Sequence, residues 1–263
     1  MSTNIRLFLR GVRASWAIQL VDLSPSLYFG MRVPRIVMQA LFFVFMAKAA
    51  GGDELARFAL IGNAIHIAVL YAIISMDVVI EIEKWSNTLM YLIASPANWF
   101  PLLLGRSMAS FVDAFMSTGI IFAVLIPVLG VHISVKNLLS SIPLILITVA
   151  SASALGWLVG TIALPTRWGN LLSNMLGYSM MIFCGINFPF STLPPTIQFL
   201  GKLLPVTHGL LAIRNVIDGA TYMSVYPLIG KEILIGLIYS GLAWFIFAYR
   251  LWVTRERGSF ELV

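Results

Sequence analysis

The stretch CGINFPFSTLPPTIQFLGKLLPVTHGLLAIRNVIDG, Cys184–Gly219, decides the fold of this chain. It contains four prolines, Pro189, Pro194, Pro195 and Pro205, a density that breaks a membrane-spanning helix. The stretch is nevertheless mostly apolar and carries only three charged residues, which is unusual for an aqueous loop. Non-helical backbone at membrane depth is tolerated only where it is buried in protein or lines water. The sequence therefore predicts a segment that dips into the membrane without crossing it.

Two short helices, at about 194–204 and 206–217, fit the apolar periodicity of this stretch. Pro194 stands at the start of the first helix, and Pro205 breaks the chain between the two. We expect them to form a re-entrant helical hairpin within residues 189–219, on the outer side of the membrane and before the last span.

The composition of the whole chain is that of an integral membrane protein. Its 263 residues are 59% hydrophobic and 11% charged, with a mean hydropathy of +0.92, whereas a soluble domain is about 25% charged. The apolar residues occur in long runs, which favours helices over the short alternating strands of a barrel. We expect an all-α polytopic protein with a single transmembrane domain over residues 1–263.

Six apolar runs approach the roughly 20 residues that a bilayer core requires. Lys and Arg residues set their orientation: with the N-terminus inside, 11 lie on the inner side and 6 on the outer side, out of 17. We therefore expect both termini to be cytoplasmic and the protein to cross the membrane several times. The predicted spans are 33–50, 58–80, 107–129, 139–163, 171–188 and 228–249.

The segment before the first span has the pattern of an interfacial helix. Apolar residues including Phe8 and Val12 recur at helical spacing, and Arg6, Arg10 and Arg13 fall on another side. The pattern predicts an amphipathic helix over 4–30 that lies in the inner membrane interface, in contact with lipid. The alternative is a frayed cytoplasmic tail.

No catalytic or metal-binding pattern is present in the sequence. It contains no P-loop, no H-E-x-x-H, no paired-Cys metal spacing and no G-x-S-x-G. The three histidines lie in different segments, and Cys184 is the single cysteine. We therefore expect neither an enzyme acting alone nor a metal or cofactor bound to this chain.

Few polar residues interrupt the predicted spans. Asp113 lies seven residues beyond Arg106, on the same face of a helix, and predicts a structural polar contact. Asn63 and His66 predict hydrogen bonds between helices. This scarcity of membrane-embedded charge argues against an ion-coupled transporter, so the driving energy would come from outside the chain.

Two blocks of sequence carry a family resemblance. The first, EKWSNTLMYLIASP, follows the second span and supplies an acidic residue, a Thr-Leu pair and a later proline, with Asn87 where a glycine is usual. The second block lies within the proline-rich stretch. Together they resemble the permease subunits of the type-two family of ATP-binding-cassette (ABC) exporters. The matching residues are Glu83, Thr88, Leu89 and Pro96 in the first block, and Gly185, Phe188, Pro189, Leu193, Pro194, Leu204, Pro205 and Arg214 in the second.

The resemblance implies that the chain pairs with a second permease copy, as a homodimer or with a close paralogue. It also implies a separate cytosolic ABC ATPase subunit, which binds ATP and Mg²⁺, and no nucleic-acid partner. The segment 81–98, with Glu81, Glu83, Thr88, Leu89 and Pro96, would be the helix that couples to this ATPase. The second block would form the outer gate of the path.

The path itself would lie at the dimer interface. Two helical stripes could supply it, although both are equally compatible with packing: Met38, Phe42 and Met46, and Asn174, Tyr178 and Met181. The favoured cargo is a small amphipathic drug or natural product, because flexible Met and aromatic surfaces suit varied cargo. Lipid-linked polysaccharide or teichoic acid is the alternative cargo, and a non-transporting membrane scaffold is the alternative function.

Overall fold

The computed structural model describes residues 3–22, 24–85, 100–164, 166 and 168–257. Every regular element in these residues is helical. The elements are α1 (Thr3–Asp22), α2 (Pro25–Leu27), the π-helix η1 (Tyr28–Arg32), α3 (Val33–Trp85), α5 (Phe100–Leu129), α6 (Val135–Ala163), α7 (Gly169–Phe183), the 3₁₀ helix η2 (Phe190–Thr192), α8 (Pro195–Leu203), α9 (Thr207–Ile217) and α10 (Tyr222–Arg257).

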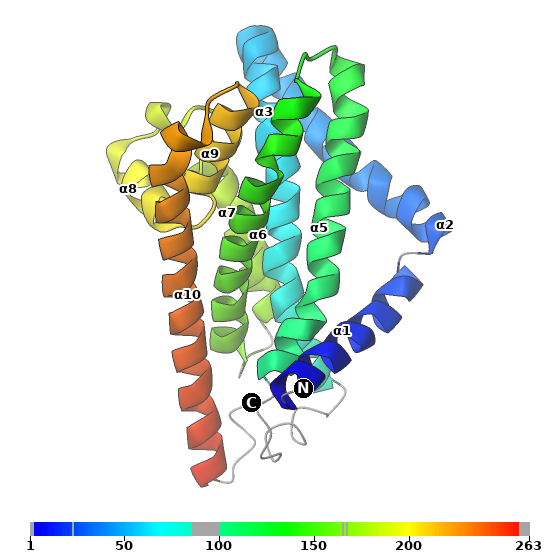
Figure 1. Cartoon of the computed structure of the whole chain (residues 1–263), viewed down its shortest axis with the longest axis vertical. Helices are drawn as coiled ribbons and strands as arrows, with labels where there is room; N and C mark the ends of the chain where they lie inside the picture. Colours follow the sequence, from blue (N-terminus) through cyan, green and yellow to red (C-terminus); the bar gives the residue numbers. More distant parts are fainter. Residues whose placement is uncertain (1–2, 23, 86–99, 165, 167, 258–263) are drawn as a thin grey trace.

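The long helices α3, α5, α6, α7 and α10 run along the length of the molecule (Figure 1). The start of α1 and the end of α10 lie at one end of this bundle, which we call the termini end. The short helices α8 and α9 lie toward the opposite end, which we call the hairpin end (Figure 1). The two ends therefore carry different kinds of structure.

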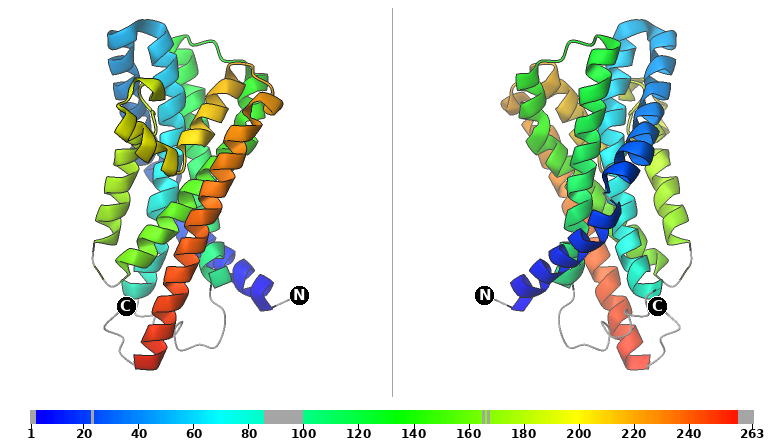
Figure 2. Two further views of the ribbon diagram at one scale, coloured as in Figure 1. Left: turned by 90° about the vertical axis from the view of Figure 1, so that its left-hand side faces the viewer. Right: turned by 90° about the vertical axis from the view of Figure 1, so that its right-hand side faces the viewer.

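Helix α3 folds back on itself at Gly51 and Gly52 (Figure 2). Gly52 has a φ of 73°, a left-handed conformation that favours glycine because it has no Cβ. The two limbs of α3 correspond to the spans predicted over 33–50 and 58–80. The connection between them is shorter than predicted, because the second limb already begins next to Gly52.

Four helices in the described residues are long and apolar enough to cross a membrane, or five if α8 and α9 together form one span. Helix α7 contains 15 residues and ends at Phe183, short of the span predicted over 171–188. It ends there because Gly185 has a φ of 65°, which turns the chain out of the helix. The count of six spans stays a prediction, whereas the all-helical membrane fold is confirmed.

The N-terminal segment is helical but divided. The helix predicted over 4–30 ends as α1 at Asp22, and Pro25 begins α2, since a proline disfavours helix in the residue before it. Helix α1 crosses α5 closely: a methyl group on Gly11 would overlap the backbone of α5, and one on Gly105 would overlap the backbone of α1. The interfacial position of α1 stays a prediction.

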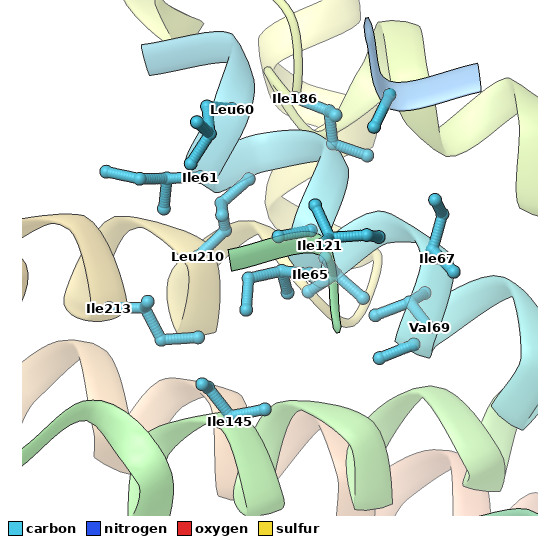
Figure 3. Close-up of a cluster of buried hydrophobic side chains, with 14 of the residues drawn as sticks. Leu60, Ile61, Ile65, Ile67, Val69, Ile121, Ile145, Ile186, Leu210 and Ile213 are labelled. Atoms are coloured by element: carbon cyan, nitrogen blue, oxygen red, sulfur yellow. The ribbon is translucent and has the colours of Figure 1, made fainter. Parts of the chain in front are cut away.

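The core lies around the second limb of α3. Residues 61–70 of this limb are buried without exception, and α5, α6, α7 and α9 pack around them. Figure 3 shows that the packed side chains are branched aliphatic ones drawn from several helices. The cluster includes Leu60, Ile65, Ile121, Ile145, Ile186, Leu210 and Ile213.

Candidate functional site

The proline-rich stretch forms the hairpin that its sequence predicts. Helices α8 and α9 meet at an angle of 92° across a short break. Pro194 immediately precedes α8, and Pro205 lies in the break. The predicted bounds of 194–204 and 206–217 are each within one residue of the observed helices at either end. The two short helices are therefore confirmed, whereas their re-entrant position on the outer side of the membrane stays a prediction.

A buried carboxylate from α10 caps the start of α9. One oxygen of Glu232, Oε1, accepts a hydrogen bond from the backbone N–H of Val206 at 2.7 Å, and Oε2 accepts one from Gly209 at 2.9 Å. The first N–H groups of a helix have no partner within the helix, and the helix dipole favours a negative charge there. Glu232 therefore satisfies two buried donors that apolar neighbours would leave unpaired.

The backbone at this cap is strained. Val206 has a φ of 88°, the only non-glycine residue with a positive φ among the described residues. A β-branched residue in this region is a clear outlier, and such strain persists only where surrounding contacts hold it. The hydrogen bond from the Val206 N–H to Glu232 is one such contact, so the carboxylate stabilises the sharp bend between α8 and α9.

Arg214 holds the other end of α9. Its guanidinium donates hydrogen bonds to the carbonyl oxygens of Gly185 at 2.9 Å, Ile186 at 2.7 Å and Phe58 at 3.2 Å. It also lies 3.3 Å from the centre of the Phe58 ring, where a cation is attracted to the aromatic face. Arg214 is buried, and it joins α9 both to the turn after α7 and to the second limb of α3.

These contacts define what we call the hairpin clamp: Glu232, Arg214 and the backbone groups that they bind. Glu232 ties the start of α9 to α10, and Arg214 ties its end to α3 and to the turn after α7. Both charges suit the helix dipole of α9, negative at its start and positive near its end. The hairpin is therefore fixed to α10, to α3 and to the turn after α7, so a displacement of these elements acts on it directly.

The clamp gathers some of the predicted gate residues and leaves others apart. Arg214 binds Gly185, and Pro194 and Pro205 shape the hairpin. The remaining three lie in the connection before α8, where they are exposed or partly exposed: Phe188, Pro189 and Leu193. Their role in an outer gate stays a prediction.

The predicted coupling segment lies mostly outside the described residues. Glu81 does not begin a separate helix, because α3 continues unbroken to Trp85. Glu83 lies in this last turn of α3, and Thr88, Leu89 and Pro96 lie outside the described residues. The coupling role of 81–98 stays a prediction.

The two predicted path stripes differ in exposure. Met38, Phe42 and Met46 are all exposed on the first limb of α3, at 65%, 60% and 52%. On α7, Tyr178 is exposed but Met181 is buried in the core, so the second stripe is not one continuous face. Asn174 is partly exposed, and its side chain bonds within α7 to Asn170.

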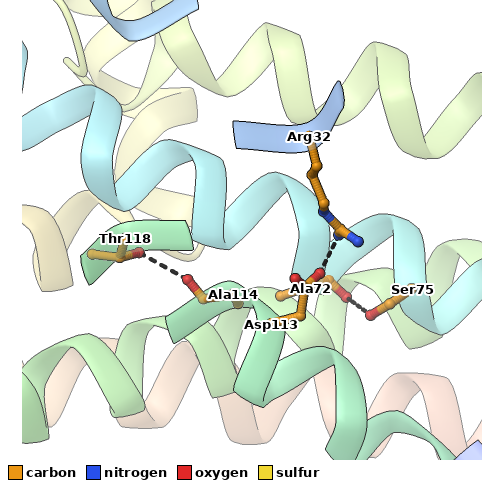
Figure 4. A network of polar contacts seen from close by, with 6 residues as sticks. All are labelled: Arg32, Ala72, Ser75, Asp113, Ala114 and Thr118. Atoms are coloured by element: carbon orange, nitrogen blue, oxygen red, sulfur yellow. Dashed lines mark hydrogen bonds and ion pairs between the residues drawn. The ribbon is translucent and has the colours of Figure 1, made fainter. Parts of the chain in front are cut away.

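The hydrogen bond predicted from His66 to another helix is confirmed, whereas Asn63 bonds to the turn after α7. Asn63 Nδ2 donates to Asn187 Oδ1 at 2.7 Å, and His66 Nε2 lies 2.9 Å from the carbonyl oxygen of Gly177 on α7. The predicted polar contact of Asp113 also exists, since Asp113 forms an ion pair with Arg32 of η1 (Figure 4). Asn63 and His66 join α3 to α7 and to the turn after it, and the Arg32–Asp113 pair joins η1 to α5.

Sequence reasoning missed Glu232 and the Arg32–Asp113 pair. Glu232 is an acidic residue inside the predicted last span, and an ionisable residue at such a position is by itself a signal worth following. Its partners are backbone N–H groups, which no side-chain pattern reveals. Within the described residues, no group of three or more His, Cys, Asp or Glu side chains could hold a metal ion.

A comparison with protein families matches residues 17–217 of this chain to the ABC-2 type transporter family. The match covers most of the chain, including α3 to α9 and the whole hairpin. A search of curated proteins found no match to the chain. Since the family match spans well over half of the sequence and the structure is all-helical with several apolar spans, the chain belongs to the ABC-2 type transporter family, as a permease component of an ABC transporter.

Proposed function

We propose that this chain is the membrane-spanning subunit of an ATP-driven exporter. Two permease copies would form the path, and separate cytosolic ATPase subunits would supply the energy. The family match carries this proposal, because an ABC-2 permease implies an ATP-binding partner subunit.

The exposed stripe on the first limb of α3 supports a path at the dimer interface. Met38, Phe42 and Met46 point away from the core of the single chain, so a second copy or lipid covers them in the membrane. A stripe of this kind binds amphipathic compounds through flexible apolar contacts. We assign it to the path, together with the exposed Tyr178 on α7.

The hairpin clamp supports an outer gate at the hairpin end. If closure of the ATPase pair tilts the long helices, α9 moves with α3 and α10 because Arg214 and Glu232 bind it to them. The two states of the transporter then differ in the position of the hairpin, and their relative stability depends on nucleotide and cargo. In this scheme the hairpin end faces outward, and both termini are cytoplasmic in a bacterial membrane.

The proposed cargo is a small amphipathic drug or natural product. Residues 42–45 of the first limb provide phenylalanines but no Trp or Tyr, whereas channels for glycans are rich in aromatic side chains that stack on sugars. Stimulation of ATP hydrolysis in the reconstituted complex tests this choice. Small amphipathic compounds should raise the rate, and lipid-linked glycans should not; the opposite pattern would reassign the cargo.

A cysteine cross-link tests the dimer path. In a background in which Cys184 is replaced by Ala, Met38→Cys should cross-link two copies of the chain, because Met38 lies on the proposed interface. Leu234→Cys is the matched control, since Leu234 is similarly exposed but belongs to α10, which lies across the bundle from the first limb of α3 (Figure 1). Equal cross-linking at both positions would remove the support for this interface.

A further inference from the structure

A cavity of about 310 Å³ lies between α1, η1, α3 and α5, apart from the hairpin clamp and from the exposed α3 stripe. Ligand pockets begin at roughly this size, about 300 Å³. It is bounded by elements of a single chain, so it does not depend on a second copy. Its lining includes Ser15, Arg32, Tyr71, Arg106, Ser110 and Asp113, together with aliphatic side chains from α3.

One wall of the cavity is polar. Arg106, Ser110 and Asp113 are spaced four and three residues apart on α5, so they lie on one face of that helix. Ser15 of α1 and Arg32 of η1 add a hydroxyl and a second guanidinium. Two guanidinium groups and one carboxylate give this wall an excess of positive charge.

The part of the lining that α3 supplies is mostly apolar, with Tyr71 and Ser75 as its polar residues. Ile74, Val78 and Ile82 are spaced four residues apart on α3, and Val79 lies beside them. The cavity therefore offers both charged hydrogen-bond donors and a hydrocarbon surface. A ligand that matches both has an anionic group and an apolar chain.

Arg32 is held in place before any ligand binds. Its Nη2 forms the ion pair with Asp113, which is almost fully buried (Figure 4), and its guanidinium lies 4.6 Å from the centre of the Tyr71 ring. A guanidinium has five N–H donors, and the ion pair leaves others free to bind a ligand. The Arg32 side chain is 26% exposed, so the cavity is open to its surroundings.

The elements around the cavity indicate where the ligand comes from. Helix α1, which supplies Ser15, exposes Arg6, Arg10 and Arg13. A basic helix of this kind attracts anionic lipids in a membrane interface, and basic pockets between membrane helices bind lipid head groups. Arginine also matches the geometry of a phosphate group by paired hydrogen bonds.

We propose that this cavity binds an anionic phospholipid of the membrane, whose phosphate is held by Arg32 and Arg106 and whose acyl chain lies along the aliphatic wall of α3. The site is separate from the transport path, so it acts on whichever cargo the protein carries. A bound lipid bridges α1, α3 and α5, and it stabilises the crossing of the N-terminal helix with the bundle.

Native mass spectrometry of the full chain in detergent tests the proposal. The wild-type chain is mixed with equal amounts of phosphatidylglycerol and phosphatidylcholine, and bound lipid is counted. We expect the wild type to retain more phosphatidylglycerol than phosphatidylcholine. Arg106→Gln should reduce this preference roughly tenfold, because it removes a charge-assisted hydrogen bond to the phosphate. Arg35→Gln is the matched control, because Arg35 is an exposed arginine outside the cavity lining, and it should keep the preference.

A second variant keeps every charge. Ile74→Trp places a larger side chain in the cavity and should lower the amount of bound phosphatidylglycerol, with the unfolding midpoint confirming that the chain is folded. sn-Glycerol 3-phosphate, which has the head-group phosphate without acyl chains, should not displace the lipid. The proposal would be overturned if the wild type bound the two lipids equally, or if glycerol phosphate displaced the lipid. It would also be overturned if folded Ile74→Trp bound lipid as the wild type does, or if Arg106→Gln and Arg35→Gln lost equal preference.

Discussion

Replacing Glu232 by glutamine should loosen the start of α9 without changing the shape of the buried side chain. The carboxylate accepts two backbone hydrogen bonds, from Val206 at 2.7 Å and from Gly209 at 2.9 Å. An amide has only one oxygen acceptor, and its NH₂ group cannot accept from a second N–H. One of the two buried backbone donors therefore loses its partner.

The size of the effect follows from that one bond. A hydrogen bond to a charged group contributes about 1.5–3 kcal/mol. Since 1.4 kcal/mol corresponds to a factor of about ten, Glu232→Gln should raise the opening equilibrium of the start of α9 by roughly 10- to 150-fold. The strain at Val206, with its φ of 88°, acts in the same direction once the bond is lost.

Amide hydrogen exchange measures this opening directly. A peptide covering residues 204–211 should exchange faster in Glu232→Gln by the predicted factor, under conditions where exchange follows the opening equilibrium. Glu54→Gln is the control, because Glu54 is exposed on α3 and its carboxylate caps no helix in the described residues. Unchanged exchange in this peptide, or an equal increase in the control, would refute the capping role of Glu232.

Three further substitutions test other parts of the account. Arg214→Met should lower the unfolding free energy by about 3 kcal/mol, since three carbonyl partners lose a charged donor. Arg57→Met removes an exposed ion pair with an aspartate and should lower the unfolding free energy by no more than about 1 kcal/mol. Thermal unfolding of the two variants compares these effects. Gly62→Ala should reduce the yield of folded protein on size-exclusion chromatography, because a methyl group there would overlap the backbone of Ile186. Gly241→Ala should keep the wild-type yield, because a methyl group there meets open space. Equal yields of the two variants would contradict the close packing at Gly62. Thr88→Pro should leave membrane insertion and ATP hydrolysis intact while abolishing transport, and normal transport in that variant would show that the coupling assignment is wrong.

The hairpin could be predicted from the sequence because its signals are local. Proline fixes its own backbone and restricts the residue before it, so Pro194 and Pro205 set the start of α8 and the break after it. The reversal inside α3 has a similarly local cause in two adjacent glycines, but the sequence alone suggested a longer connection there.

The clamp could not be predicted in the same way. The partners of Glu232 and Arg214 are backbone groups from segments distant in the sequence, and no side-chain pattern encodes such pairs. Arg32 and Asp113 also lie 81 residues apart, on elements whose approach depends on the packing of α1 and η1. Helical spacing places Arg106 on the same face as Asp113 but gives no sign that Arg32 approaches from another element.

Transport by the purified chain in proteoliposomes tests the central claim most directly. The chain is reconstituted with and without its partner ATPase subunit, and accumulation of an amphipathic compound is followed with ATP, without ATP, and under an imposed ion gradient. The account predicts accumulation only when both the ATPase subunit and ATP are present. Accumulation by the chain alone under an ion gradient, without ATP, would contradict it.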